Sequence, residues 1–287
     1  MGMLSIVRFT IQEAFHRWIL FVMVCLNLLL IIAFAFLLND IYPSISAGSS
    51  TSVSTQLRML EFNVEISGLI TWLVYLLSGV LTIILTIGMT SGEIESGTIA
   101  MIITKPLRRM EIIFGKWLGY GLIVCIYTAM LFCSFLGIVY WITGYWPQQA
   151  FQTLGTLELS PLVLLALTTL GSACVPTLIN GAIVIFLFIG APLASFIQLL
   201  VTATGTKSQN IATIINLIIP TDALWRGATF YLLPPATLQL LSGQNTSSIS
   251  GIFIALQPIA PGLLIWAIIY CLVLPVIGAI RFQRRDL

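Results

Sequence analysis

Six apolar segments, each long enough to cross a lipid bilayer as an α-helix, constrain the fold of this chain more than any other feature. A membrane-spanning helix needs about 20 consecutive, predominantly apolar residues. Runs of this kind occupy residues 18–38, 67–90, 117–142, 159–177, 180–202 and 262–281. Only 8 % of the 287 residues are charged, against about 25 % in a soluble domain. We therefore predict an all-α, multi-pass protein of the plasma (inner) membrane, with residues 1–287 forming one six-helix transmembrane domain.

Lysines and arginines are distributed unevenly over the segments that join these spans. Cytoplasmic segments of membrane proteins carry an excess of these two residues. Nine of the twelve fall on one predicted side and three on the other. The nine are Arg8, Arg17, Lys105, Arg108, Arg109, Lys116, Arg281, Arg284 and Arg285. We therefore predict that both termini and the 91–116 loop face the cytoplasm, which agrees with an even number of spans.

Residues 4–17, LSIVRFTIQEAFHR, are predicted to form an amphipathic helix that lies in the membrane interface. One helical face carries Leu4, Val7, Ile11 and Ala14, and the opposite face carries Arg8, Gln12, Glu13 and His16. Glu13 and Arg17 form a favourable pair at i, i+4. A helix of this kind contacts membrane lipid through its apolar face. An ordinary cytoplasmic lead-in segment is the alternative.

Three segments are predicted on the outer side of the membrane, at residues 39–66, 143–158 and 203–261. The first is polar and rich in Ser and Thr, and the second is short. The third is long and contains NLIIPTDALWRGATFYLLPP, residues 216–235. We interpret this stretch as short helices packed at the outer rim.

The residues of this outer stretch suggest where such a helix begins and ends. Thr221 and Asp222 are expected to cap its start, and the two prolines at 234–235 to end it. Trp225 and Tyr231 suit the membrane–water interface, where aromatic rings with one polar edge are common. The stretch is therefore predicted to lie at the outer boundary of the membrane.

The sequence contains no motif of a catalytic, metal or nucleotide site. His16 is the only histidine, and all five cysteines lie inside apolar runs, where a thiol usually behaves as a small hydrophobe. No GxSxG, HExxH or GxxxxGK[ST] sequence occurs. We expect no catalytic residue, metal or cofactor in this chain, and the net charge of +2 gives no indication of a nucleic-acid partner.

Apart from Arg281, the last residue of the sixth span, the six predicted spans contain no Asp, Glu, Lys, Arg or His. Proton- and ion-coupled transporters usually hold ionisable residues inside the membrane. Energy for uphill transport would therefore have to enter from outside the bilayer, and the charged cytoplasmic loop is the expected place. A channel is an alternative, because pores can be lined by backbone carbonyls.

Charge is concentrated in one short segment, GEIESGTIAMIITKPLRRMEIIFGK at residues 92–116. It holds seven of the 22 charged residues of the chain. An acidic pair, an apolar stretch and a basic group follow one another, and a short helix over 97–104 is expected to end before Pro106. This succession favours a docking element for another protein. A topology anchor is the alternative, but it accounts only for the bases, because Glu93 and Glu95 contribute little to orientation.

The same segment resembles the signature of ABC-2-type transporter permeases, which is E-x-E-x-G-T followed by P-x-x-R and G-K. The matching residues are Glu93, Glu95, Gly97, Thr98, Pro106, Arg109, Gly115 and Lys116. The layout of nearly the whole chain is also similar, from the N-terminal helix through six spans and a long last outer loop to the basic tail RFQRRDL.

This resemblance implies a partner and a mechanism. In such permeases the loop between spans two and three holds a coupling helix that seats in a groove of a separate ABC ATPase subunit. The residues implied in this contact, within 92–109, are Glu93, Glu95, Gly97, Thr98, Pro106, Arg108 and Arg109. The resemblance also implies a second permease chain, identical or related, and two ATPase subunits that bind ATP and Mg²⁺. It further implies export, with outer helices between spans five and six capping the exit path.

Span two carries hydroxyl groups at helical spacing, which makes it a candidate wall of a translocation path. The residues are Thr71, Tyr75, Ser78, Thr82 and Thr86, at i, i+4, i+7, i+11 and i+15, which keeps them on one helical face. Because lipid offers hydroxyls no partners, this face should point inward. Alternatively, each hydroxyl bonds a carbonyl one turn back or joins neighbouring helices. Asn180 and Gln198 are further candidates in span five, and Asn27 is a weaker one in span one.

The leading hypothesis is the permease subunit of an ABC exporter for an amphipathic, lipid-like, drug or peptide cargo. A membrane scaffold or signalling component that docks an ATPase without transport is the second hypothesis, since its docking features would be the same. An intramembrane enzyme is disfavoured because paired polar catalytic groups are missing.

Overall fold

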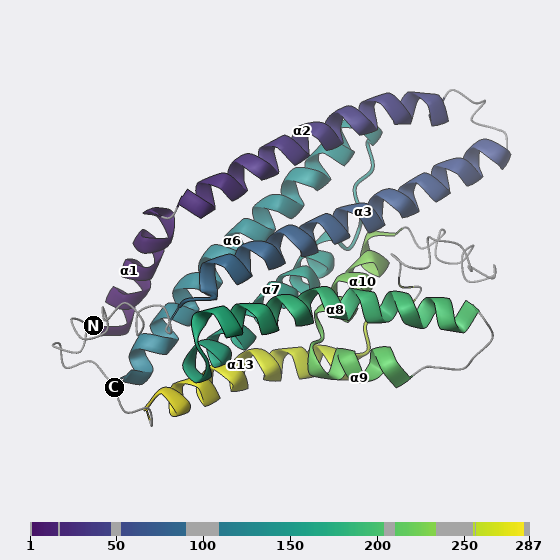
Figure 1. The fold of residues 1–287 in the computed structure, drawn as a ribbon. Coiled ribbons are helices and arrows are strands. Elements are labelled where there is room, and N and C mark those ends of the chain that lie inside the picture. The colour runs from purple at the N-terminus through teal and green to yellow at the C-terminus, as the bar shows by residue number, and fades with distance from the viewer. Residues whose placement is uncertain are drawn as a thin grey trace.

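In the computed structural model all the described secondary structure elements are α-helices (Figure 1). The structure describes residues 2–16, 18–46, 53–89, 109–203, 210–233, 255 and 257–283. Within these ranges the helices are α1 (Gly2–His16), α2 (Trp18–Ser46), α3 (Val53–Thr86), α6 (Arg109–Thr143), α7 (Ala150–Cys174), α8 (Thr177–Ala203), α9 (Asn210–Ile218), α10 (Thr221–Leu232) and α13 (Pro261–Gln283).

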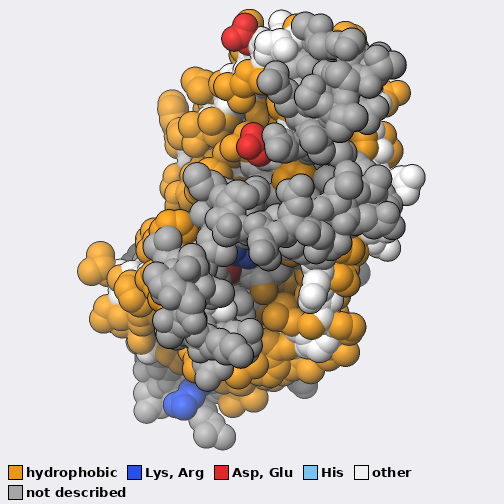
Figure 2. Space-filling model, turned by 90° about the vertical axis from the view of Figure 1, so that its right-hand side faces the viewer, with side chains coloured by type: hydrophobic (Ala, Val, Ile, Leu, Met, Phe, Trp, Pro, Cys, Tyr) orange, Lys and Arg blue, Asp and Glu red, His pale blue; other side chains and the backbone are white. Residues whose placement is uncertain are grey.

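Six of these helices, α2, α3, α6, α7, α8 and α13, are long and apolar enough to cross a membrane. The prediction of six spans is therefore confirmed. The helices run roughly along one common axis, with α2, α3 and α6 above α7, α8 and α13 in the view of Figure 1. Hydrophobic side chains cover most of the described surface at the end where α2 ends and α3 begins (Figure 2).

Helices α3 and α7 form the centre of the bundle. In the most apolar 18-residue stretch of each helix, 67 % of the residues of α3 and 61 % of those of α7 are buried. Helix α7 packs against α3, α6, α10 and α13. By contrast, only 17 % of the residues in the corresponding stretch of α2 and 28 % of those in α13 are buried. These peripheral helices expose large apolar side chains such as Phe36 and Leu272, as expected of surfaces that contact lipid.

The predicted outer loop at 39–66 is wrong over most of its length. Helix α2 continues to Ser46, and α3 already begins at Val53. Helix propagation adds one hydrogen bond for each residue that it fixes, so a helix continues readily into a polar segment. The hydropathy pattern indicates where the apolar residues end, and these helices extend beyond that point.

The bounds of two further spans bring ionisable residues into the bundle. Helix α6 begins at Arg109, so Lys116 lies within it, and α7 begins at Ala150, so it contains Glu158. The outer loop predicted at 143–158 shrinks accordingly to residues 144–149. The prediction that the spans contain no ionisable residue is therefore wrong, because it was drawn from segments that were too short.

One end of the bundle gathers several chain segments around the first turns of α6. Ile113 of α6 packs in an apolar cluster with Ala173 of α7 and with Ala279 and Phe282 of α13. Helix α1 also packs along α6. The close turn predicted between the fourth and fifth spans lies between the end of α7 and the start of α8, around Pro176.

Glycine at position 119 allows α1 to approach α6 closely. A Cβ atom there would lie 2.9 Å from Cβ of Thr10, which is below normal contact distance. Thr10 and Ala14 of α1 are both fully buried. Gly119, the second glycine of the sequence Gly115-x-x-x-Gly119, therefore permits the close contact between α6 and α1.

Candidate functional site: the hydroxyl face of α3 and a buried aspartate on α10

The five hydroxyl residues of α3 all point into the bundle. Thr71, Ser78, Thr82 and Thr86 are fully buried, and Tyr75 is 3 % exposed. Their inward orientation, expected from the helical spacing, is confirmed. Most of these hydroxyls donate to carbonyls of the preceding turn, as for Thr82 to Ser78 O and Thr86 to Thr82 O, both at 2.6 Å. The hydroxyls are thus satisfied within the helix, as the alternative interpretation expected.

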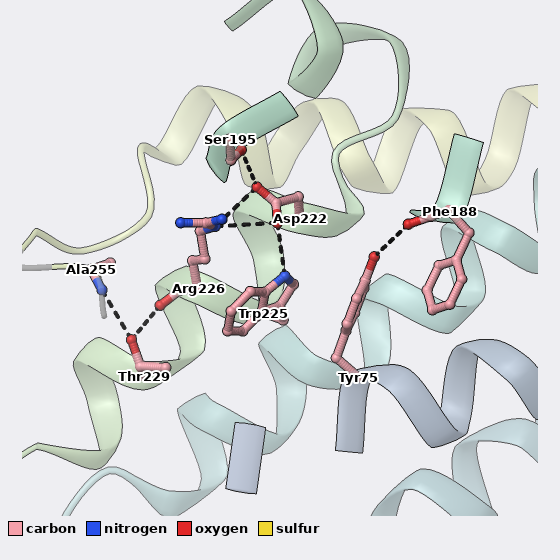
Figure 3. Close-up of polar contacts among 8 residues, drawn as sticks. All are labelled: Tyr75, Phe188, Ser195, Asp222, Trp225, Arg226, Thr229 and Ala255. Atoms are coloured by element: carbon pink, nitrogen blue, oxygen red, sulfur yellow. Dashed lines mark hydrogen bonds and ion pairs between the residues drawn. The ribbon is translucent and has the colours of Figure 1, made fainter. Parts of the chain in front are cut away.

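Two of these residues also bond to neighbouring helices. The hydroxyls of Thr86 and Thr168 lie 2.8 Å apart, which links α3 to α7. The Tyr75 hydroxyl donates to the carbonyl of Phe188 in α8 at 3.2 Å (Figure 3). The Tyr75 ring packs on Phe188, with ring centroids 4.9 Å apart, and stacks on Trp225 of α10 at 5.7 Å. Aromatic rings therefore fill the space where α3, α8 and α10 meet.

Asn180 connects three helices near the opposite end of the hydroxyl face. It is 1 % exposed, and its Nδ2 donates to the carbonyls of Ile87 and Thr168, each at 3.2 Å. Ile87 follows α3 and Thr168 belongs to α7. A single amide of α8 thus bridges the ends of the two central helices.

The carboxylate of Asp222, on α10, lies at the centre of a buried polar cluster (Figure 3). Asp222 is 0 % exposed. Its Oδ1 accepts from Trp225 Nε1 at 2.9 Å, and the Arg226 Nε lies 3.0 Å from Oδ2. Its Oδ2 also accepts from the Ser195 hydroxyl of α8. A buried carboxylate is stable only when its charge is paired and its lone pairs accept hydrogen bonds, and this cluster meets both conditions.

Further polar contacts hold the end of α10. The Thr229 hydroxyl accepts from the backbone N–H of Ala255 at 3.1 Å (Figure 3). The Tyr145 hydroxyl, from the loop between α6 and α7, donates to Leu232 O at 2.9 Å. Partial burial raises the pKa of Tyr145, so this hydroxyl remains a protonated donor near neutral pH. Helix α10 is therefore fixed at its start to α8 and at its end to the α6–α7 loop.

The family of the chain follows from a comparison of the whole sequence. The model of the family described as "ABC-2 family transporter protein" matches residues 6–287 of the chain. This chain belongs to the ABC-2 family. The match covers nearly the full length, so the resemblance noted at residues 92–116 extends to the entire six-span domain. Among curated protein sequences, none matches the chain significantly. As an ABC-2 permease, the chain is a multi-pass membrane subunit of a transporter, and its family implies an ABC ATPase as partner.

The permease differs from the sequence-based predictions at α10. Thr221 and Asp222 do not cap this helix, because its N-cap is Pro220 and no side-chain cap bond forms. Trp225 is 1 % exposed, so its predicted interfacial position is wrong, and Tyr231 is half-buried. The reason is that α10 packs against α3, α7 and α8 inside the bundle. Asp222 consequently accepts hydrogen bonds from Ser195 of α8 and from Trp225 and Arg226 of its own helix, and does not cap the helix start.

Other predicted residues of the permease are placed less centrally. Gln198 is half-buried on α8, and Asn27 is buried on α2. Arg8 of α1 is exposed and Glu13 is half-buried, whereas Arg17 lies outside the described residues. The predicted coupling segment also lies outside them, apart from Arg109, whose backbone begins α6.

Two features of the permease were not predicted from its sequence. One is the cluster around Asp222, for which the i, i+4 spacing of Asp222 and Arg226 was an available indication. The other is the burial of Lys116, which was noted only as part of a motif. Within the described residues, no three His, Cys, Asp or Glu side chains are grouped so that they could hold a metal ion.

Proposed function

We propose that this ABC-2 permease forms the membrane path of an ATP-driven exporter and receives its energy through residues 92–109. The observation that carries the proposal is that this segment joins α3 to α6, and both helices pass through the buried interior of the bundle. A displacement of the segment would therefore act directly on the helix with the hydroxyl face.

The partner in this proposal is a separate ABC ATPase that binds ATP and Mg²⁺. Two ATPase subunits would serve two permease chains, the second being identical or related. The proposed contact residues are Glu93, Glu95, Gly97, Thr98, Pro106, Arg108 and Arg109. The excess of Lys and Arg in this segment and near both termini supports a cytoplasmic orientation for them.

Helix α1 is proposed to lie in the cytoplasmic interface of the membrane. Its apolar side chains Leu4, Phe9 and Phe15 are exposed, and amphipathic helices bury such side chains at the boundary of headgroups and acyl chains. Its packing against α6 would carry movement of the interface helix to the same helix that follows the coupling segment.

The hydroxyl face of α3 supports an amphipathic or lipid-like cargo. Hydroxyls and the aromatic rings of Tyr75, Phe188 and Trp225 offer polar and apolar contacts without net charge. In the described structure this region is filled by side chains, so export would require α3, α8 and α10 to separate. Helix α10 would close the outer end of the path in the resting state.

Replacing Thr82 and Thr86 together with valine tests the hydroxyl face. The two hydroxyls mainly bond carbonyls of their own helix, so we expect a loss of stability of only about 1 kcal/mol for each hydroxyl. Transport of the amphipathic cargo should fall much more than stability does. The matched control is Thr128→Val, because Thr128 is also fully buried and bonds a carbonyl one turn back, but lies on α6. Transport of every cargo at the wild-type rate would reject α3 as the wall of the path.

A scaffold that docks an ATPase without transport is the competing function. Reconstitution of the permease with its ATPase in vesicles, with fluorescent phospholipid and cationic amphiphile probes, separates the two. We expect at least one probe to accelerate ATP hydrolysis and to cross the bilayer only when ATP is present. An ATP hydrolysis rate that no probe changes, together with intact docking, would favour the scaffold.

A further inference from the structure

Lys116 is a charged side chain buried among the helices. It is 4 % exposed, and its Nζ donates to the backbone carbonyl of Met89 at 2.8 Å. Burying an ammonium group costs several kcal/mol unless its charge and protons are satisfied. An apolar residue at this position would avoid that cost, so the contact that Lys116 makes requires an explanation.

Met89 lies just beyond the end of α3. The helix ends at Thr86, and the chain continues in a turn in which the N–H of Met89 donates to Thr86 O at 3.1 Å. The last carbonyls of a helix lack intrahelical donors and form the negative end of its dipole. The ammonium group of Lys116 is therefore favourably placed at this end. The bond joins the turn that follows α3 to α6, the helix that begins at Arg109.

We propose that Lys116 is a positioning residue that ties together the two ends of the coupling segment, so that α3 and α6 move as one unit. The inference rests on the proposed function, in which the ATPase displaces residues 92–109. Apolar contacts are non-directional, whereas a hydrogen bond is directional and is lost beyond about 3.5 Å. The Lys116–Met89 bond thus adds a directional restraint against a relative shift of α3 and α6 to the restraint that their packing provides.

The part of α6 that carries Lys116 contacts the remaining helices at this end of the bundle. Gly119 touches Thr10 of α1, and Ile113 packs with Ala279 and Phe282 of α13. A movement of this part of α6 would therefore reach α1 and α13 directly. It would reach α3, which carries the hydroxyl face, through the packing of α3 against α6 and through the Lys116–Met89 bond.

The first experiment measures whether nucleotide moves the spans. The full chain is reconstituted with its ABC ATPase in nanodiscs, the five native cysteines are replaced, and spin labels are placed on Leu69→Cys of α3 and Ile185→Cys of α8. Both positions are exposed, at 38 % and 44 %. With a non-hydrolysable ATP analogue we expect the distance between the labels to change in the otherwise native chain. We expect that change to be lost in Lys116→Met, with the ATPase still bound, and retained in Lys116→Arg.

The outcomes separate this inference from the function on which it rests. A nucleotide-dependent shift in Lys116→Met equal to that of the native chain would overturn the role of Lys116 and leave the proposed function intact. An ATPase that fails to bind the native chain would overturn the proposed function, and the inference with it. A purely structural role predicts a lower unfolding temperature for Lys116→Met without loss of the shift.

A covalent link provides a second test that does not depend on the stability of Lys116→Met. Met89→Cys and Lys116→Cys are combined in the cysteine-free chain and bridged by a bismaleimide. If the native permease stimulates ATP hydrolysis by its ATPase, we expect the double cysteine variant to lose this stimulation before it is bridged. We expect the bridged variant to regain it. Full stimulation in the unbridged variant, or none after bridging, would contradict a mechanical tie.

Discussion

Replacing Asp222 with alanine is expected to destabilise the folded bundle by about 3–5 kcal/mol, because it removes one partner of a buried ion pair. The carboxylate accepts bonds from Ser195, Trp225 and Arg226. In Asp222→Ala these donors lose their acceptor, and the Arg226 guanidinium, whose side chain is only 18 % exposed, loses its counter-ion. The unfolding temperature measured in detergent should therefore fall clearly.

The matched control for this substitution is Asp40→Ala. Asp40 belongs to α2 and is exposed, so loss of its carboxylate should change stability by no more than about 0.5 kcal/mol. If Asp222→Ala and Asp40→Ala unfolded at the same temperature, the cluster at α10 would not stabilise the bundle. The bonds described above would then add no net cost to the departure of α10 from the bundle.

The number of spans could be predicted from the sequence because the thickness of the bilayer fixes how long an apolar run must be. The helix ends could not, because hydropathy indicates contact with lipid and α2 and α3 extend well beyond it. For the same reason the presence of Lys116 in α6 and of Glu158 in α7 was not predicted, because both lie in helical turns beyond the predicted apolar segments. Helix spacing, in contrast, correctly predicted that the hydroxyls of α3 face inward.

The position of α10 could not be predicted, because its sequence, TDALWRGATFYL, places charged residues among apolar ones. Asp222 and Arg226 suggested exposure when each was considered alone. The two side chains neutralise each other at i, i+4, and Ser195 completes the bonding from α8, a partner distant in sequence. Burial of α10 depends on this tertiary contact, which no local pattern indicates. Trp225 is drawn into the core by the same arrangement.

Reversing the acidic pair of the coupling segment should have the largest functional effect. In Glu93→Lys with Glu95→Lys, the two proposed acidic contacts with the ATPase would become repulsive. Juxtaposed like charges cost several kcal/mol at an interface, and a cost of about 3 kcal/mol corresponds to a loss of at least about 100-fold in affinity. We therefore expect the ATPase to dissociate from the doubly substituted permease.

The matched control reverses two acidic residues elsewhere. Asp40→Lys with Glu65→Lys makes the same change in net charge at two exposed positions, on α2 and α3. This variant should retain the ATPase. Any general effect of the changed net charge on expression would appear in both variants.

Co-purification of the permease with its ABC ATPase, compared between the native chain and these two variants, tests the central claim most directly. The account predicts that the ATPase remains with the native chain and with Asp40→Lys/Glu65→Lys and is lost from Glu93→Lys/Glu95→Lys. Undiminished binding to Glu93→Lys/Glu95→Lys would contradict it and would move the contact to α1 or to the basic C-terminal tail.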